Sequence, residues 1–461
     1  MIAQPDSSSP RRTVVLVVAT MAAFLAPFMS ASVNVALPSI GKEWDLPAVV
    51  LGWIATSNIL AAAVFLVPFG KLSDIIGRKK VFGWGSLIYT LSSCSAAIAP
   101  SIAVLFAARV FQGLGGAMIF STGVAMLTSA YPAHERGRVL GVNVASTYLG
   151  LSLGPVLGGF LTQHWGWRSV FWLSGILGLI VFGIVIARLE GEWTEARGEK
   201  FDAAGAVLLG AALIAVMLGF SLLPKISGGA LVAAGIAGMF AFVGVENKVA
   251  YPVLDMKLFR SNPVFSFSNL AALIHYSATF AVGFFLSLHL QNVKGLSPQK
   301  AGFVLIAQPI LMAVLSPLAG RLSDRLEPRL LASSGMSLSV LGLILLSVVN
   351  RETGLSFIVL ALAVLGFGFA LFSSPNTNAV MSSVEKRSYG VASAMLGTMR
   401  LTGQMFSMGV AMLIFSLYLG QGRIGPETVP EFLSAQKTAF LFFAGLCLAG
   451  VFASLKRGKL R

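Results

Sequence analysis

The chain has 461 residues, of which 56% are hydrophobic and only 11% are charged, whereas a water-soluble domain carries about 25% charged residues. Its net charge of +15 would favour a nucleic-acid partner in a soluble protein. Here the basic residues fall in short segments between apolar runs, where membrane insertion and anionic lipid explain them. Cys94 and Cys447 lie inside apolar runs, so no disulfide framework or Cys/His metal site is available. We therefore expect an integral membrane protein that contacts lipid, with no nucleic-acid partner, metal or cofactor.

Fourteen apolar runs are long enough to cross a membrane as helices, because a hydrocarbon core of about 30 Å needs roughly 20 helical residues. The first run follows Arg11 and Arg12 and is longer than the apolar core of a signal peptide, so we expect a retained helix. The connectors are short and contain helix breakers such as Pro100 and Pro298. The runs begin near Thr13, Ala48, Val81, Ser101, Val139, Arg168, Ala203, Gly228, Val264, Ala301, Leu330, Leu355, Gly390 and Lys437.

Lysine and arginine are distributed unevenly between alternate connectors. If the N-terminus is cytoplasmic, 23 of the 33 basic residues lie on the inner side and eight on the outer side, while Arg109 and Arg400 lie within helices. Inner loops of membrane proteins carry the excess of positive charge. Both termini are therefore predicted to be cytoplasmic.

Two connectors repeat nearly the same residues. Residues 70–80 read Gly-Lys-Leu-Ser-Asp-Ile-Ile-Gly-Arg-Lys-Lys, and residues 320–325, 250 positions later, read Gly-Arg-Leu-Ser-Asp-Arg. The first and ninth runs are separated similarly, which indicates two six-helix halves with an inserted pair of helices between them. Coincidence between two basic loops is the alternative, and the shared register disfavours it. The predicted units are an N-terminal bundle over 1–188, a linker with two helices over 189–262, and a C-terminal bundle over 263–461.

Three segments resemble motifs of the major facilitator superfamily. Residues 70–80 are similar to its motif A, residues 105–113 to its motif B, and residues 150–159 to its antiporter motif C. With fourteen spans and the segments 201–205 and 252–260, the chain resembles the fourteen-helix drug:proton antiporters along nearly its whole length.

This resemblance implies a fold class and a general function. The fold would be an all-α membrane protein of the major facilitator type, with two six-helix bundles plus two inserted helices. The function would be secondary transport rather than enzymatic catalysis, by a monomer in a plasma membrane that needs no cofactor. Its partners would be a small-molecule substrate and, as the coupling ion, the proton.

Motif A also has a physical interpretation as a conformational latch. Its glycines permit a tight turn, its aspartate can meet a helix N-terminus or a basic partner in one conformation, and its basic residues stay near lipid headgroups. A solvated, positively charged loop is the alternative. Ile75 departs from the arginine common in the family. The residues assigned to the latch are Gly70, Asp74, Gly77 and Arg78, with Gly320 and Asp324 in the second copy.

Motif C places glycines four residues apart on one helix face. This spacing permits close approach of a neighbouring helix, and the proline beside it removes one helical hydrogen bond. Small residues at this spacing are common in membrane helices, so the signal gains specificity only as part of the motif. The residues are Gly150, Gly154, Pro155, Gly158 and Gly159.

The membrane interior is predicted to contain no carboxylate, because all 18 acidic residues fall in connectors or at helix ends. The antiporter family typically has an aspartate five residues before Asn34, where this chain has Met29. A buried carboxylate is the usual group that exchanges a proton for an organic cation, so its absence puts both coupling and cation preference in question. The main titratable groups left at depth are Arg109, His275, Tyr276 and Arg400.

Polar residues inside the spans are the candidates for a substrate or coupling site. An unpaired charge at the depth of Arg109 would cost at least ~2.5 kcal/mol, so Arg109 is predicted to face the bundle interior. It can pair with backbone carbonyls, Gln112 or an anionic substrate, and a packing arginine is the alternative. His275 can change charge near neutral pH, although a hydrogen-bonded core histidine is the simpler interpretation. The candidates are Asn34, Trp53, Arg109, Gln112, His275, Tyr276, Asn376 and Asn378, with Asn58, Asn143, Tyr148, Gln308 and Gln404 as further residues for lining a cavity.

Three classes of function compete. Export by alternating access with proton antiport is the leading hypothesis, and uptake or facilitated diffusion of a metabolite or organic anion is the alternative within transport. A membrane-embedded enzyme is disfavoured because the sequence shows no His-x-x-x-His pattern, paired membrane carboxylates or nucleophile with a base. A sensor is disfavoured because the longest hydrophilic segments, near 190–202 and 421–436, have the length of linkers.

Overall fold

The computed structural model describes residues 10–194, 196–223, 225–249, 252, 262–323, 326–384, 389–420 and 424–458. Within these ranges the chain is almost entirely helical and contains no strand, which confirms the all-α fold class. Asp324 and most of the segment 252–260 lie outside the described residues.

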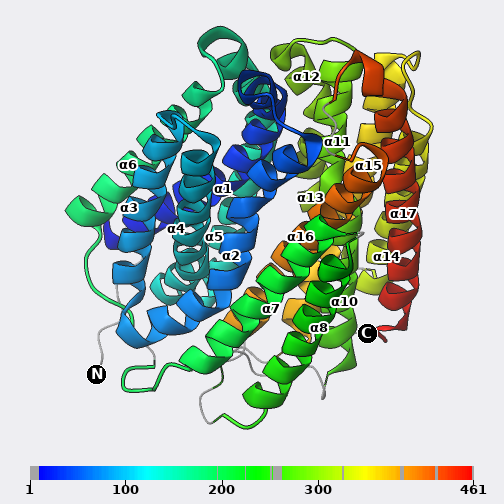
Figure 1. Cartoon of the computed structure of the whole chain (residues 1–461). Coiled ribbons are helices and arrows are strands. Elements are labelled where there is room, and N and C mark those ends of the chain that lie inside the picture. Colours follow the sequence, from blue (N-terminus) through cyan, green and yellow to red (C-terminus); the bar gives the residue numbers. More distant parts are fainter. Residues whose placement is uncertain are drawn as a thin grey trace, which may run out of the picture.

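Six long helices form the first bundle, two form an inserted hairpin, and the rest form the second bundle (Figure 1). The first bundle contains α1 (Pro10–Trp44), α2 (Ala48–Ile76), α3 (Arg78–Ala97), α4 (Ile102–Ala130), α5 (Ala133–Trp165) and α6 (Arg168–Arg188). The hairpin contains α7 (Ala203–Leu222) and α8 (Ile226–Glu246). The second bundle contains α10 (Pro263–Thr279), α11 (Ala281–Leu288), the π-helical turn η1 (His289–Val293), α12 (Pro298–Leu305), α13 (Ala307–Ser323), α14 (Pro328–Ser347), α15 (Leu355–Ser382), α16 (Tyr389–Tyr418), the 3₁₀ turn η3 (Pro426–Thr428) and α17 (Val429–Lys456).

Thirteen spans in the described part of the chain are long and apolar enough to cross a membrane. The fourteenth predicted span is α3, a 20-residue helix whose first turn consists of the basic residues of motif A, which lower its mean hydropathy. These basic residues belong to helix α3, so the prediction that they form a loop is wrong. A helix makes its backbone hydrogen bonds internally, whatever its side chains. It can therefore extend beyond the apolar run that crosses the membrane. For the same reason α17 begins at Val429 rather than near Lys437.

Each bundle is held together by close helix pairs. In the first, α1 packs on α5, α2 on α4, and α3 on α4 and α6; in the second, α14 packs on α15 and α17, and α10 on α16 and α17. The hairpin lies across the junction of the bundles, because α7 contacts both α2 and α16 (Figure 1). We call the end where α2 finishes at Ile76 the motif A end, and the opposite end, where α1 finishes at Trp44, the far end.

The repeat is visible in local hydrogen bonds. The Ser73 hydroxyl donates to the Gly70 carbonyl at 2.7 Å, and the Ser323 hydroxyl donates to the Gly320 carbonyl at the same distance. The two helices that follow, α3 and α14, begin 250 residues apart. The two copies of the motif therefore share this hydrogen bond near the ends of α2 and α13.

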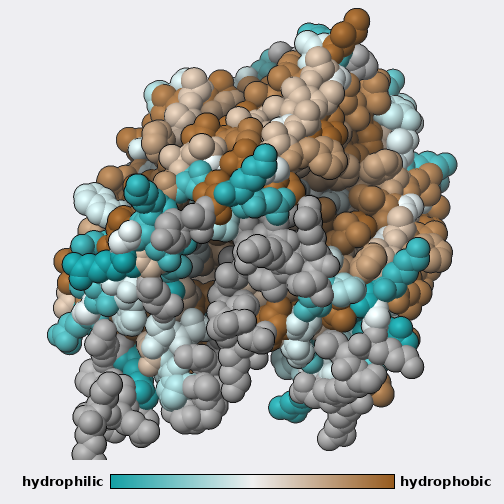
Figure 2. Space-filling view, turned by 90° about the horizontal axis from the view of Figure 1, so that it is seen from below, coloured by the Kyte–Doolittle hydropathy of each residue, from teal (hydrophilic) through white to brown (hydrophobic). Residues whose placement is uncertain are grey.

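The surface is suited to lipid on its sides and to water at its end. Large apolar side chains are exposed on the bundle sides, with Trp84 at 63%, Ile186 at 65% and Phe240 at 76% of their full exposure. Figure 2, which views the molecule from below, shows groups of hydrophilic side chains in the lower half of the picture and a broad hydrophobic area above them. This distribution is the one that a membrane-spanning protein needs.

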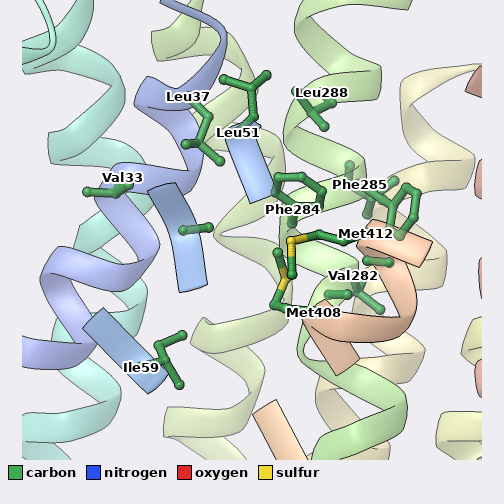
Figure 3. Close-up of a cluster of buried hydrophobic side chains, with 14 of the residues drawn as sticks. Val33, Leu37, Leu51, Ile59, Val282, Phe284, Phe285, Leu288, Met408 and Met412 are labelled. Atoms are coloured by element: carbon green, nitrogen blue, oxygen red, sulfur yellow. The ribbon is translucent and has the colours of Figure 1, made fainter. Parts of the chain in front are cut away.

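The largest apolar core runs without interruption from one bundle to the other. Side chains of α1 and α2 meet those of α11 and α16, and Figure 3 shows Leu37 and Leu51 opposite Phe284 and Met412. The Gly52 position is so close to Met412 that an added Cβ would lie 2.7 Å from its Cγ. The two bundles are therefore sealed together by apolar packing toward the far end.

Candidate functional site

The motif A segment is bound by the linker that follows α6. Gly77 has a φ of +118°, a conformation that favours glycine, and it separates α2 from α3. The Lys79 amide donates to the Glu192 carboxylate at 2.7 Å, and the Arg78 amide donates to the Trp193 carbonyl at 3.1 Å. Lys71 pairs with Glu199 at 2.5 Å. The sequence predicts only a connector here, and the contacts of its acidic residues with motif A are found in the structure alone.

Within motif A, Asp74 and Arg78 form an ion pair at 2.7 Å. Arg78 also donates to the Ser129 hydroxyl at 2.6 Å, so the pair is anchored on α4 of the same bundle. The Asp74 carbonyl accepts from the Ala196 amide of the linker. In the second copy, Gly320 lies against α15, where an added Cβ would be 2.8 Å from Ser374 Oγ. These contacts place both motifs at helix junctions.

Arg109 and Gln112 lie inside the first bundle and bond to each other. Arg109 is fully buried and donates to Gln112 Oε1 at 2.5 Å and to Asn58 Oδ1 at 2.7 Å. It also donates to the Ile54 carbonyl at 3.1 Å, and Gln112 in turn donates to Ser93 Oγ at 2.8 Å. The charge is therefore met by carbonyl oxygens rather than by a carboxylate. A ligand would have to displace these acceptors to reach it.

His275 lies in the interior of the second bundle. Its ring stacks on Phe372 with centroids 4.1 Å apart, and its Nε2 lies 3.1 Å from Ser339 Oγ. Its side chain is fully buried, and its Nδ1 has no hydrogen-bond partner among the described residues. Its neighbour Tyr276 is only partly buried and lies on the side of α10 that faces α16. The two adjacent candidates therefore have different surroundings.

Asn376 and Asn378 bond within the second bundle near the motif A end. Asn376 accepts from Arg457 at 2.9 Å and donates to the Ser268 carbonyl at 3.1 Å. Asn378 donates to Ser323 Oγ at 2.9 Å. Arg457 is one of the basic residues near the C-terminus, and its sequence position does not distinguish it from them. It is only 1% exposed, and burial lowers its pKa to about 10.

The far end is closed by contacts between the bundles, and Asn34 takes part in them. The Ser287 hydroxyl on α11 donates to the Asn34 carbonyl on α1 at 2.5 Å. Proline has no N–H, so Pro38 leaves that carbonyl without its usual partner four residues along the helix. Gln291 donates to the neighbouring Val35 carbonyl at 2.9 Å. Trp53 is partly buried and packs against the largest apolar core, which contains residues of both bundles.

The glycines of motif C fit two different surfaces. Gly150, Gly154 and Gly158 lie against α1, and the Ser32 hydroxyl on α1 donates to the Gly154 carbonyl at 2.9 Å. Gly159 faces the other bundle, where an added Cβ would lie 2.5 Å from the Pro298 carbonyl oxygen. On α12, a Cβ at Gly302 would overlap the Pro155 carbonyl oxygen. This motif therefore joins α5 both to its own bundle and to the second one.

Midway along the junction, polar and aromatic side chains of both bundles meet. The Tyr148 hydroxyl on α5 lies 3.0 Å from Ser373 Oγ on α15. The guanidinium of Arg400 on α16 lies over the Phe120 ring of α4, 4.8 Å from its centroid. Tyr276 on α10 lies near Tyr148, Ser373 and Arg400. The five helices that supply these residues come from both bundles.

The comparisons with known proteins identify the family. The family model described as Major Facilitator Superfamily matches residues 19–408 and 268–459. The chain belongs to the major facilitator superfamily. It is 25% identical over 446 residues to the riboflavin transporter RibZ of Clostridioides difficile (strain 630), covering 96% of each chain. It is 32% identical over 453 residues to the cephamycin export protein CmcT of Amycolatopsis lactamdurans, covering 96% of this chain and 92% of that one.

A multidrug resistance protein and a solved structure extend the comparison. The chain is 30% identical over 393 residues to the multidrug resistance protein Stp of Mycobacterium tuberculosis (strain CDC 1551 / Oshkosh), covering 84% of this chain and 73% of that one. A bacterial homolog of the human lysosomal transporter Spinster, in an inward-facing and unoccupied conformation, superposes with a TM-score of 0.71 at 16% identity and covers 98% of each chain. This structural likeness shows the major facilitator fold, and the fold and relatives are those of transporters.

Replacing Arg109 by lysine should destabilise the first bundle. Lysine keeps the charge but lacks the planar fork that serves several acceptors at once, so Asn58 and Gln112 would lose donors. Leaving buried acceptors unsatisfied costs about 1–3 kcal/mol. We expect a lower Tm for purified Arg109→Lys in detergent than for wild type, with Arg351→Lys, an exposed arginine, as the control. Equal melting temperatures for all three proteins would contradict the contact analysis.

Replacing Gly302 by alanine should open the far end. The alanine Cβ would clash with the backbone carbonyl of Pro155. Rotation of a side chain cannot relieve a clash with backbone, so the two bundles must move apart. Ser39, half-buried beside a cavity of about 350 Å³ at this end, can report on the change as Ser39→Cys in a background without native cysteines. We expect water-soluble maleimide to label it several-fold faster with Gly302→Ala. Gly445→Ala, where nothing lies within 4 Å, is the control. An unchanged labelling rate in Gly302→Ala would show that the far end does not depend on this contact.

Proposed function

We propose that this superfamily member exports small organic molecules from the cell by alternating access. The observation that carries the proposal is the division of the bundle junction into two zones. Close backbone contacts and apolar packing seal the far end, whereas polar and aromatic side chains meet at mid-depth. Rocking of the bundles about such a junction exposes the middle to one side of the membrane at a time. The relatives named for cephamycin export and multidrug resistance support export as the direction.

We propose that the motif A end lies in the cytoplasm of a cell whose plasma membrane holds the protein as a monomer. The excess of basic residues on that side supports this orientation. In this arrangement the sealed far end faces outward. Motif A, whose Asp74 and Arg78 form an ion pair, then lies at the cytoplasmic entrance, where its likeness to the family motif implies a latch.

Proton antiport is the coupling that we propose first, because of the likeness to motif C. No acidic residue lies within the membrane interior of the sequence, so a proton must be carried by another group. His275 is the histidine at mid-depth whose ordinary titration range suits this role. Its described neighbours are Ser339, Tyr276 and two phenylalanines, without a carboxylate.

A second candidate function is transport of an organic anion or metabolite without proton coupling. The presence of Arg400 at the bundle junction and the absence of a carboxylate in the membrane interior favour it. A relative named as a riboflavin transporter is compatible with a metabolite as the substrate.

Flux measurements in proteoliposomes distinguish the two functions. Under proton antiport, an imposed pH gradient should accelerate movement of an accumulated dye, and a protonophore should remove the acceleration. Loss of the acceleration in His275→Asn, with downhill flux retained, would assign the coupling to His275. Dye movement that follows only the dye gradient would contradict antiport and favour the second function. Liposomes without protein and the Gly445→Ala protein provide the controls.

A further inference from the structure

Arg400 differs from the other buried or aromatic-stacked arginines in what balances its charge. Arg109 is met by side-chain and backbone oxygens of its own bundle. Arg168 lies 4.3 Å from the centroid of the Trp167 ring and also pairs with the Glu43 carboxylate at 2.7 Å. Arg400 lies over the aromatic ring of Phe120 and near Tyr276, but it makes no ion pair with any described residue. The surroundings of Arg400 therefore resemble those of Arg168 without the Glu43 carboxylate.

The sequence offers no carboxylate to complete this arrangement. All acidic residues fall in connectors or at helix ends, whereas Arg400 lies eleven residues after the start of α16, about 16 Å along the helix. A charged residue at such a depth costs at least ~2.5 kcal/mol unless it is paired or solvated. A cation–π contact offsets about 0.5–2 kcal/mol of this free-energy cost. An anion bound at Arg400 would supply the missing partner.

The residues around Arg400 lie at one level and come from both bundles. Tyr148 and Tyr276 are fifteen and thirteen residues from the starts of α5 and α10, or about 22 and 20 Å from the motif A end. Gly403, one turn after Arg400, allows α16 to approach α10 so closely that an added Cβ would lie 2.9 Å from Tyr276 Cβ. Each of the four side chains is only partly buried. Opening of the junction would therefore expose them together.

We propose that Arg400, Tyr276, Tyr148 and Phe120 form a mid-membrane binding site for an organic anion that carries a planar aromatic ring. The guanidinium binds the carboxylate, phosphate or sulfonate group as a planar fork, and the tyrosine hydroxyls donate further hydrogen bonds. The Phe120 ring, which now lies under the guanidinium, stacks with the aromatic part of the ligand. An organic cation is disfavoured because the permanent charge of Arg400 repels it. This assignment rests on the proposed transport function and names its substrate class.

Direct binding tests the site independently of transport. Fluorescein serves as the aromatic anion and ethidium as the aromatic cation, each titrated into the purified full-length protein in detergent and followed by fluorescence anisotropy. We expect wild type to bind fluorescein more tightly than ethidium. Arg400→Gln should weaken fluorescein binding by at least about tenfold, and Arg400→Lys should weaken it less, since the charge remains while the fork is lost. Arg168→Gln, which removes an aromatic-stacked arginine outside this site, should leave the affinity unchanged.

Two controls keep the outcomes separate. Size-exclusion profiles and Tm values identify a variant that fails to fold. If Arg400→Gln fails to fold, the affinity of wild type for fluorescein is compared with that of Arg400→Lys. Absence of fluorescein binding to wild type, or equal affinity in wild type and Arg400→Gln, would overturn the anion site. Fluorescein and ethidium fluxes in proteoliposomes are measured in parallel. Fluorescein binding that depends on Arg400, without fluorescein flux, would support the anion site and count against export. Ethidium flux without fluorescein binding would support export and count against the anion site.

Discussion

Lipid offers no hydrogen bonds, and this constraint explains most polar contacts inside the protein. Every buried donor or charge has to find its partner within the chain, or it destabilises the fold by several kcal/mol. Arg109 satisfies the constraint through side-chain amide and backbone carbonyl oxygens of one bundle, and the two terminal nitrogens of Arg457 donate to Asn376 and to a carbonyl of α14. These two arginines tie helices together within a bundle. Arg400 lies between bundles instead, where its surroundings change whenever the bundles move.

Because lipid offers no hydrogen bonds, a proline in a membrane helix leaves a carbonyl that must be bonded by another helix. Pro38 cannot donate to the Asn34 carbonyl, and in lipid that carbonyl would be left without a partner. The partner comes from Ser287 in the other bundle. Separation of the bundles at the far end would therefore expose an unsatisfied acceptor until water reached it. The close glycine contacts of Gly159 and Gly302 beside it add packing but no such polar cost.

Much of the fold follows from the sequence, because its determinants are local. The length of apolar runs predicts the spans, and the 250-residue repeat predicts the equivalent hydrogen bonds in the last turns of α2 and α13. The glycines of motif C lie at close contacts with neighbouring helices. Helix ends were less predictable: the basic residues of motif A begin α3 because helical backbone needs no apolar side chains.

The candidate site was less predictable, because it depends on pairs of residues that are distant in sequence. Polarity and depth selected Arg109, His275 and Tyr276, but they could not show that the first two are enclosed within single bundles while Tyr276 is beside Arg400. The contact of Phe120 with Arg400 joins residues 280 positions apart, and an aromatic side chain in a membrane helix gives no signal of its own. Likewise, nothing in the order of residues shows that Glu192 meets the amide of Lys79.

The linker and the inserted hairpin connect motif A with helix α16. The linker is held by motif A through Glu192, Trp193 and Glu199, and it leads directly into α7. Helix α7 then crosses from α2 to α16, where Phe220 packs on Phe406 with ring centroids 5.3 Å apart. Movement of α16 relative to α2 must therefore break or slide one side of the α7 contact. Because α16 also carries Arg400, a change at motif A and a change at the mid-membrane residues are linked through one continuous segment of the chain.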